Sequence, residues 1–248
     1  MESIILIISA FITSSISAVL GMGGGIILLG IMAILIPEGY MVIALHGIIQ
    51  LVSNATRTFV FRSHLKQNLI KEFFIGAIIG LSFSGLIIYL LVLGFDVQSA
   101  KELKVDFLKP VIGIFILWYL YLKGPKKKKD SKTFSKVGLI SGFSTVFIGA
   151  TGPLIAPFFI NDKFSKENII ANKAACQVIS HLGKIPLFIF FFKMDYFAEF
   201  KVLIPLIIAV LIGTNLGKHI LQFIPENIFR KVFKILLTVI SLKLIFLQ

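Results

Sequence analysis

The chain has 248 residues, of which 57% are hydrophobic and only 15% are charged, and its mean hydropathy is +0.96. A soluble domain of this length would carry far more charge on its surface, so this composition excludes an ordinary soluble protein. The formal charge of +13 would suit a nucleic-acid-binding protein, but the basic residues fall mainly in short loops between apolar runs, as in membrane proteins. We therefore predict an all-α integral membrane protein.

Eight apolar segments follow one another along the chain, most of them near the roughly 20 residues that cross a bilayer. They cover residues 4–36, 40–61, 73–95, 107–122, 137–160, 168–192, 202–222 and 228–247. Glycines interrupt the first and the fifth segment. Residues 3–20 have the length of a signal peptide but lack a basic start, because Glu2 is the only charge nearby, so we expect them to belong to the mature fold.

A basic segment divides the chain near its middle. It contains Gly124, Pro125 and the run Lys126–Lys129, which suits a cytoplasmic loop beside anionic lipid headgroups. We predict a first membrane repeat at residues 1–122, a cytoplasmic linker at 123–136 and a second repeat at 137–248. The single cysteine, Cys176, lies in an apolar run, cannot form an intramolecular disulfide and is interpreted as a packing residue.

The two halves carry similar polar patterns. Gly21-Met22-Gly23-Gly24-Gly25 matches Gly149-Ala150-Thr151-Gly152-Pro153, and Ser17 or Ser144 precedes each motif. Five later pairs share an offset of 127: His46 with Lys173, Gln50 with Gln177, Ser53 with Ser180, Asn54 with His181, and Arg57 with Lys184. Gly76 and Gly80 also loosely match Gly213 and Gly217 as sites of close helix packing. This pattern predicts an internal duplication.

Loop charge indicates how the two repeats cross the membrane. If each glycine-interrupted segment is one straight helix, the cytoplasmic loops hold twelve Lys and Arg residues and the outer loops hold nine. If each segment is instead a re-entrant hairpin of two half-helices, the tally becomes sixteen against five. Six residues then move inside (Lys163, Lys166, Lys218, Arg230, Lys231 and Lys234), and Lys193 and Lys201 move outside. The positive-inside rule favours the hairpins, which gives two inverted repeats, each with one hairpin and three transmembrane helices.

The glycine motifs predict breaks at membrane depth, which survive only where protein or a water-filled cavity satisfies the backbone. Each helix that restarts at about Gly25 or Pro153 would direct free N–H groups and a positive dipole end at whatever lies before it. A straight helix with small packing residues is the alternative interpretation of these motifs.

Two polar stripes run along predicted helices. His46, Gln50, Ser53 and Arg57 have helical spacing, and so do Lys173, Gln177, Ser180 and Lys184. Arg57 and Lys173 could also extend to the membrane interface, whereas the apolar run after Lys184 keeps that residue away from it. No Asp or Glu falls clearly within a span near the stripes, so these buried cations favour an oxyanion as partner.

His46 and His181 are candidates for carrying a coupling proton, or else hydrogen-bonded packing residues. The sequence contains no P-loop, HExxH or GxSxG motif. We therefore predict a protein that is not an enzyme and that has neither a cofactor nor a metal site.

The paired glycine motifs, in four-segment halves of a chain near 250 residues, resemble the sulfite exporter TauE/SafE family of membrane proteins. The resemblance covers nearly the whole chain. It implies transport of a sulfur-containing anion, such as sulfite, sulfoacetate or a related organosulfonate, across the bacterial plasma membrane. It also implies that Gly23, Gly24, Gly25, Thr151, Gly152 and Pro153 face the substrate. Leu29 stands where the family pattern places a proline, whereas the second half keeps Pro157.

The sequence thus predicts a multi-pass secondary transporter of a small anion, which works by rocking of one repeat against the other. Arg57 and Lys184 would balance the charge of the anion, and Gln50, Asn54, Gln177 and His181 would add hydrogen bonds. The predicted partners are the anion, the bilayer and a possible second copy of the chain, but no nucleic acid. A passive anion channel, a structural membrane protein and an enzyme acting on lipid-linked groups are the alternatives.

Overall fold

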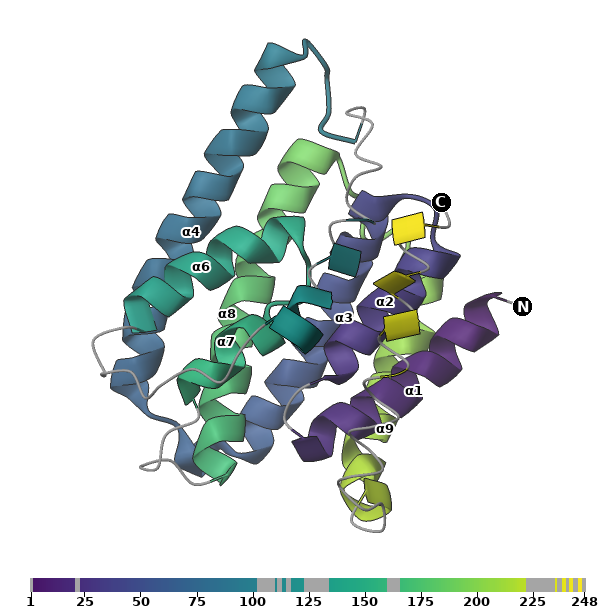
Figure 1. Ribbon diagram of the computed structural model, residues 1–248, viewed down its shortest axis with the longest axis vertical. Helices are drawn as coiled ribbons and strands as arrows, with labels where there is room; N and C mark the ends of the chain where they lie inside the picture. Colours follow the sequence, from purple (N-terminus) through teal and green to yellow (C-terminus); the bar gives the residue numbers. More distant parts are fainter. Residues whose placement is uncertain are drawn as a thin grey trace.

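The computed structural model describes residues 2–20, 23–101, 134–159 and 166–221, together with short pieces between residues 110 and 122 and between 235 and 246. The regular elements in these ranges are all helices, which confirms the all-α prediction (Figure 1). They are α1 (Glu2–Leu20), α2 (Gly24–Leu35), α3 (Gly39–Val60), η1 (Arg62–His64), α4 (Gln67–Gly94), the π-helix η2 (Trp118–Leu122), α6 (Phe134–Phe147), α7 (Gly152–Phe159), α8 (Lys166–Phe192) and α9 (Phe200–Leu221). The predicted spans 107–122 and 228–247 lie largely outside the described residues.

The chain breaks at both glycine motifs. Between α1 and α2, Gly23 has a φ of 100°, and between α6 and α7, Gly149 has a φ of 82°, a region that favours glycine. After each break the chain lies beside the helix that it has just left. Gly24 lies so close to α1 that a Cβ there would overlap the carbonyl oxygen of Thr13. In the second half, the hydroxyl of Ser141 on α6 donates a hydrogen bond of 3.2 Å to Thr151 Oγ1.

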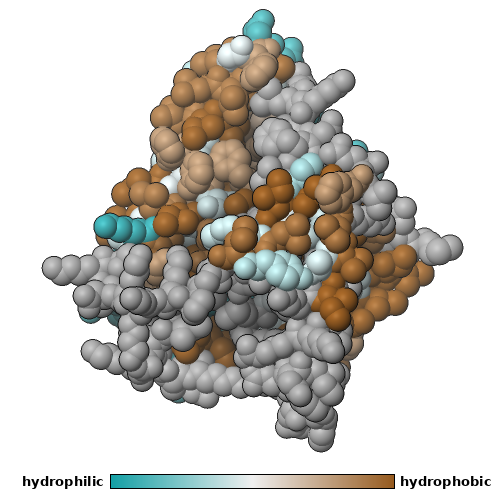
Figure 2. Space-filling view, in the orientation of Figure 1, coloured by the Kyte–Doolittle hydropathy of each residue, from teal (hydrophilic) through white to brown (hydrophobic). Residues whose placement is uncertain are grey.

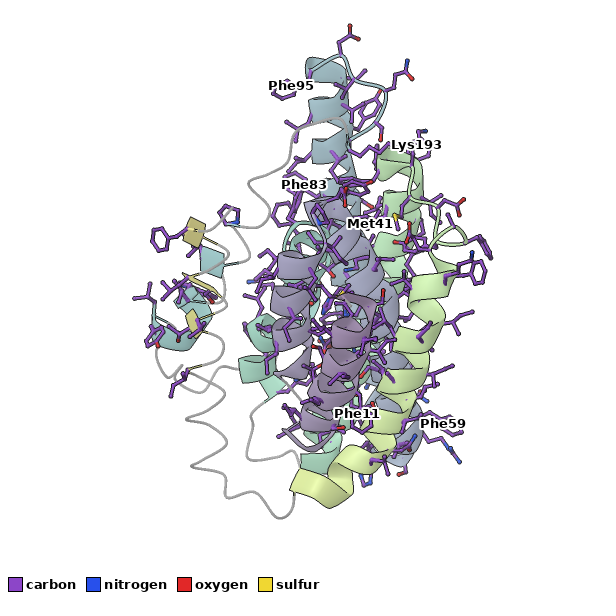
Figure 3. The ribbon with its side chains drawn as sticks, turned by 90° about the vertical axis from the view of Figure 1, so that its right-hand side faces the viewer. Phe11, Met41, Phe59, Phe83, Phe95 and Lys193 are labelled. Atoms are coloured by element: carbon purple, nitrogen blue, oxygen red, sulfur yellow. The ribbon has the colours of Figure 1, made fainter. Side chains whose placement is uncertain are left out.

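Helices α3 and α8 cross the centre of the molecule in opposite directions. Near the start of α3, Tyr40 stacks on Phe192 at the end of α8, and further along α3 His46 meets His181. Residue numbers therefore rise along one helix as they fall along the other. Figure 3 shows the same arrangement, with Phe59 near the lower end of the molecule and Lys193, which follows α8, near the upper end. These two helices carry the predicted polar stripes.

The described helices form two packing groups. The first packing group comprises α1, α2, α3 and α9, and the second packing group comprises α4, α6, α7 and α8. Apart from η1, which lies in the connection between α3 and α4, substantial packing between these groups is confined to α3 and α8 among the described helices. Each group combines helices from both predicted repeats, because α9 packs on α1 and α6 packs on α4 (Figure 1).

Close glycine contacts bring α4 and α6 together. A Cβ at Gly76 would overlap the carbonyl oxygen of Ser135, and a Cβ at Gly138 would overlap that of Phe73. Backbone can approach backbone this closely only where side chains are absent, which is the usual arrangement at tight helix contacts in membranes. The interface between α1 and α9 is similar, since a Cβ at Gly213 would overlap the carbonyl oxygen of Phe11.

The outer surface of the bundle is apolar. Helix α4 and residues 168–192 of α8 are long and apolar enough to span a bilayer, with mean hydropathies of 2.4 and 1.5 in their most apolar windows. Figure 2 shows hydrophobic surface over much of the face that it draws. Large exposed apolar side chains on α4 and α9 include Phe74, Ile75, Ile78, Ile79, Phe83, Ile204, Ile208 and Ile212. An exposed apolar area of this extent suits lipid rather than water.

The loops lie at two opposite ends of the bundle. The connection after α3 bonds to the start of α8, where Asn172 donates a hydrogen bond to the carbonyl of His64. The connection after α4 bonds to the end of α8, where the amide of Ala100 donates to the carbonyl of Phe191. The start of α8 therefore lies at the end that contains residues 61–66, whereas the end of α8 lies beside residues 99–101.

Candidate functional site

A small cavity lies where the two glycine breaks meet the polar stripes of α3 and α8. Both packing groups contribute to its walls. The residues that line it are predominantly polar or glycine: Ser17, Gly23, Gly25, Ile26, His46, Gln50, Arg57, Ala150, Gly152, Lys173, Gln177 and His181. Irregular backbone inside a membrane protein is tolerated where it borders such a cavity, so the glycine breaks and the cavity explain one another.

Arg57 is held in place by neighbours from α1 and α3. Its guanidinium donates hydrogen bonds to the hydroxyl and the carbonyl of Ser17, at 2.9 and 3.3 Å. A further bond of 2.8 Å runs to Asn54 Oδ1, and Nε donates to the carbonyl of Ser53 at 3.3 Å. The side chain is 4% exposed. These partners are neutral, so they fix the geometry of the guanidinium without cancelling its charge.

The second half contributes two buried lysines to this region. Lys173 is 2% exposed and lines the cavity together with Arg57. Lys184 is fully buried but does not line the cavity; its ammonium donates a hydrogen bond of 3.0 Å to the carbonyl of Ile43 on α3. Its side chain lies against Gly47, where a Cβ would overlap Lys184 Cε. Lys173 and Lys184 therefore occupy different environments, although both belong to the same stripe.

Two buried histidines face each other across α3 and α8, with ring centroids 6.3 Å apart. Nε2 of His46 is hydrogen-bonded to the carbonyl of Gly25 at 2.8 Å. Neither ring nitrogen of His181 has a hydrogen-bond partner among the described residues, although its ring is fully buried and lines the cavity. A buried polar group without a partner is costly, so His181 is available to a ligand in the cavity.

The glutamines repeat one contact in both halves. Gln50 lies beside Gly25, at the start of α2, and Gln177 lies beside Gly152, at the start of α7. An added Cβ would be 3.0 Å from Gln50 Oε1 in the first case and 2.8 Å from Gln177 Nε2 in the second. Gln50 and Gln177 are 127 residues apart, and so are Gly25 and Gly152. The same contact therefore occurs at equivalent positions of the two halves.

The buried charged side chains in the described part of the chain are all cations. Glu38, Glu72, Asp96 and Asp195 are exposed, and Glu199 is partly exposed. The buried charged residues in these ranges are Arg57, Lys173 and Lys184. A cavity with this charge would attract an anion, because a buried cation needs an opposite charge or dense hydrogen bonding.

Seven of the twelve predicted substrate-binding residues line the cavity: Gly23, Gly25, Gln50, Arg57, Gly152, Gln177 and His181. Four others lie beyond the lining: Gly24 packs on α1, Asn54 supports Arg57, Thr151 bonds to Ser141, and Lys184 bonds to Ile43. Pro153 is the second residue of α7, and its side chain is outside the described set. The proton candidate His46 also lines the cavity.

Four lining residues were not among the sequence-predicted site residues: Ser17, Ile26, Ala150 and Lys173. Lys173 could have been found from the shared offset, because it is the counterpart of His46 and occupies the first position of its stripe. Ser17 could also have been predicted as a site residue, because it precedes the glycine motif. Ile26 and Ala150 are ordinary apolar residues in an apolar sequence, so no pattern identified them.

Comparison with known proteins gives one match. Neither a curated protein nor a solved structure is matched by this chain. The family model described as "Sulfite exporter TauE/SafE" matches residues 6–244. This match covers almost all of the chain, and it agrees with the apolar helical bundle and with the resemblance of the glycine motifs. The chain therefore belongs to the sulfite exporter TauE/SafE family of membrane transporters.

Proposed function

We propose that the chain is a secondary transporter that moves a small sulfur-containing anion, such as sulfite, sulfoacetate or a related organosulfonate, across the bacterial plasma membrane. The observation that carries this proposal is the cavity lined by Arg57 and Lys173. The membrane transporter family of the chain supports it as well.

The chemistry of the cavity suits an oxyanion. Two cations, Arg57 and Lys173, line it. The starts of α2 and α7 border the same space through Gly25 and Gly152, so free backbone N–H groups add positive potential there. Gln50, Gln177 and His181 would provide further hydrogen-bond donors for anionic oxygens.

Two inverted repeats with re-entrant hairpins form part of this proposal. The contact of each restart with the preceding helix supports a hairpin, and so does the placement of the loops. The hairpin topology requires the start of α8 to share the cytoplasmic side with Arg62 and Lys66. It also requires Lys193 to share the outer side with Lys101. The hydrogen bonds from Asn172 to His64 and from Ala100 to Phe191 are consistent with both requirements.

Transport would proceed by alternating access around the cavity. The cavity lies at the contact between α3 and α8, which is also the main contact between the two packing groups. A change in the angle between these groups would open the cavity toward one side or the other and would leave the tight α4–α6 and α1–α9 interfaces unchanged. The moving units would then be the packing groups, each of which contains helices from both repeats.

The experiment is uptake of radiolabelled sulfite and sulfoacetate into proteoliposomes that contain the purified protein. Arg57→Met and Lys173→Met each remove one cavity cation while keeping an unbranched side chain. We expect each to lower uptake at least tenfold, since hydrogen bonds to charged groups contribute about 1.5–3 kcal/mol. Lys71→Met is the matched control, because Lys71 is exposed on α4 and should not affect uptake.

Three results would contradict the proposal. The first is no uptake of either anion by the unaltered protein, and the second is uptake by Arg57→Met and Lys173→Met at the rate of the Lys71→Met control. The third is a flux that rises linearly with sulfite concentration, without saturation or counterflow, because this would indicate a passive anion channel instead of a carrier.

A further inference from the structure

The equivalent residues Arg57 and Lys184 make contacts of different kinds. Arg57 bonds within its own packing group, to Ser17 on α1 and to Asn54 on α3. Lys184 bonds across to the other packing group, through the carbonyl of Ile43 on α3. Equivalent residues of the two halves therefore have different hydrogen-bond partners. This is expected if the residue in one half has exchanged a partner within its own packing group for a partner in the other group.

Helix α6, which carries Ser144, the sequence counterpart of Ser17, packs on α8, the helix of Lys184. Helix α4 runs parallel to α6, since Gly76 lies at Ser135 and Gly80 at Leu139, and it runs parallel to α8, since Gly183 lies at Leu81. Gly85 contacts Leu187, four residues further along each of these two helices, so α4 and α8 run in the same direction. Helices α6 and α8 therefore run in the same direction as each other.

Thr145 follows Ser144 on α6, and its hydroxyl is a second candidate partner for Lys184. The hydroxyls of Ser141 and Ser180 join α6 to α8 at 3.0 Å. One helical turn further along each parallel helix come Thr145 and Lys184. The hydroxyl of Thr145 is fully buried and has no hydrogen-bond partner among the described residues. A buried hydroxyl without a partner in one state is readily explained if it gains that partner in another state.

We infer that Lys184 is a positioning residue with two alternative hydrogen-bond partners, the Ile43 carbonyl on the first packing group and the Thr145 hydroxyl on the second. In the state described here the ammonium holds α8 against α3. When the packing groups move apart at this point, the ammonium leaves Ile43 and donates its hydrogen bond to Thr145, so the buried charge keeps a partner throughout the motion. Lys184 thus controls the change of state and does not bind the anion.

This inference rests on the proposed transport function, but it can be measured without a transported substrate. The reporter is Ala150→Cys in a Cys176→Ala background, because Ala150 lines the cavity and Cys176 is the only native cysteine. A charged, membrane-impermeant methanethiosulfonate is applied to each face of vesicles that contain the protein. The ratio of the two labelling rates reports which side the cavity faces.

Two substitutions should change this ratio in opposite directions. Thr145→Val keeps the shape of the side chain but removes the second partner, so it should favour the present state by about tenfold, the usual effect of a hydrogen bond to a charged group. Gly47→Ala places a methyl group against Lys184 Cε and should favour the opposite state. Thr145→Ser should behave like the parent protein. So should the matched control Thr214→Val, because Thr214 is another buried threonine whose hydroxyl has no partner among the described residues.

The inference is overturned if Thr145→Val leaves the labelling ratio unchanged, even where Gly47→Ala fails to fold. It is also overturned if Lys184→Met weakens sulfite binding as strongly as Arg57→Met does, since Lys184 would then be a ligand. If the parent protein labels as expected but neither binds nor carries sulfite or sulfoacetate, the proposed function fails and the inference about Lys184 stands.

Discussion

At the scale of single residues, the notable feature is how Arg57 is kept charged and ordered inside an apolar bundle. Its hydrogen bonds run in several directions, to Ser17 on one helix and to Ser53 and Asn54 on another. A guanidinium has five donors in a fixed plane and can make these bonds together, whereas an ammonium acts as a single point of charge. The shape of the side chain therefore matters here as well as its charge.

Arg57→Lys should consequently impair transport although it conserves the charge. The shorter ammonium cannot reach Ser17 and Asn54 at once, so the charge would lose its fixed position in the cavity. We expect a loss of about tenfold or more in kcat/KM for sulfite uptake, in line with the loss of bonds to a charged group. Lys71→Arg, an exposed exchange on α4, serves as the control, and an active Arg57→Lys protein would show that the hydrogen-bond geometry is unimportant.

The sequence predicted most cavity residues because their spacing repeats in both halves. The different environments of Lys173 and Lys184 could not be predicted in this way. A shared offset makes Lys184 equivalent to Arg57, but whether a side chain lines the cavity depends on contacts across the helix interface. Lys184 reaches Ile43 because Gly47 leaves space on α3, and no periodicity within α8 contains that information.

At the scale of helices, the contact between α4 and α6 depends on glycines from both sides. Gly76 and Gly80 on α4 face carbonyl groups of α6, and Gly138 and Gly142 on α6 face carbonyl groups of α4. Such reciprocal contacts let two backbones approach closely along several turns. Dispersion contacts and weak Cα–H···O bonds then hold the pair together in a medium where the hydrophobic effect contributes little.

Gly76→Ala should therefore destabilise the protein by about 1–3 kcal/mol, because the new methyl group must push two backbones apart. Gly94→Ala is the matched control in the same helix, since a Cβ at Gly94 has nothing within 4 Å. That control should be neutral or more stable by up to about 1 kcal/mol, owing to the better helix propensity of alanine. Thermal unfolding in detergent measures both, and an equal effect at the two sites would refute the close contact.

The helix breaks were predictable because a run of glycines cannot sustain a helix at membrane depth. The predicted restarts at about Gly25 and Pro153 are each within one residue of the observed starts at Gly24 and Gly152. The partner of each glycine-rich face was not predictable. Gly76 and Gly80 indicated close packing somewhere, but a list of small residues does not specify whether α6, α8 or another helix covers them.

At the scale of the whole molecule, the arrangement of the packing groups determines which motions are possible. Relative movement of two complete repeats would separate α4 from α6 and α1 from α9, where backbones touch. Movement at the contact between α3 and α8 separates side-chain contacts, several of them polar, and the bond from Lys184 to the carbonyl of Ile43. The contact that is easiest to rearrange is therefore the one that contains the cavity.

Cross-linking in the Cys176→Ala background tests this mechanism. Phe83 and Phe143 face each other on α4 and α6, within one packing group, and Tyr40 and Phe192 face each other across the two groups. Joining cysteines at positions 83 and 143 with a short thiol cross-linker should leave sulfite uptake within about twofold of the same protein without linker, because distant, unstrained sites act independently. Joining positions 40 and 192 should abolish uptake. The reverse result would contradict movement between the packing groups.

The pairing of α1 with α9 also has a consequence for biogenesis. Helix α1 meets its main partner only after about 200 further residues have been added, which takes roughly 10–40 s at typical rates of translation. During that interval the part of α1 that α9 covers in the folded protein is still uncovered. Thr13, Ser14 and Ser15 each donate a hydrogen bond to a carbonyl of the preceding turn, so their polar groups are satisfied before α9 arrives. Helix α1 can therefore wait for α9 with these hydroxyls satisfied, and Ser15 adds its bond to the carbonyl of Gly213 when α9 inserts.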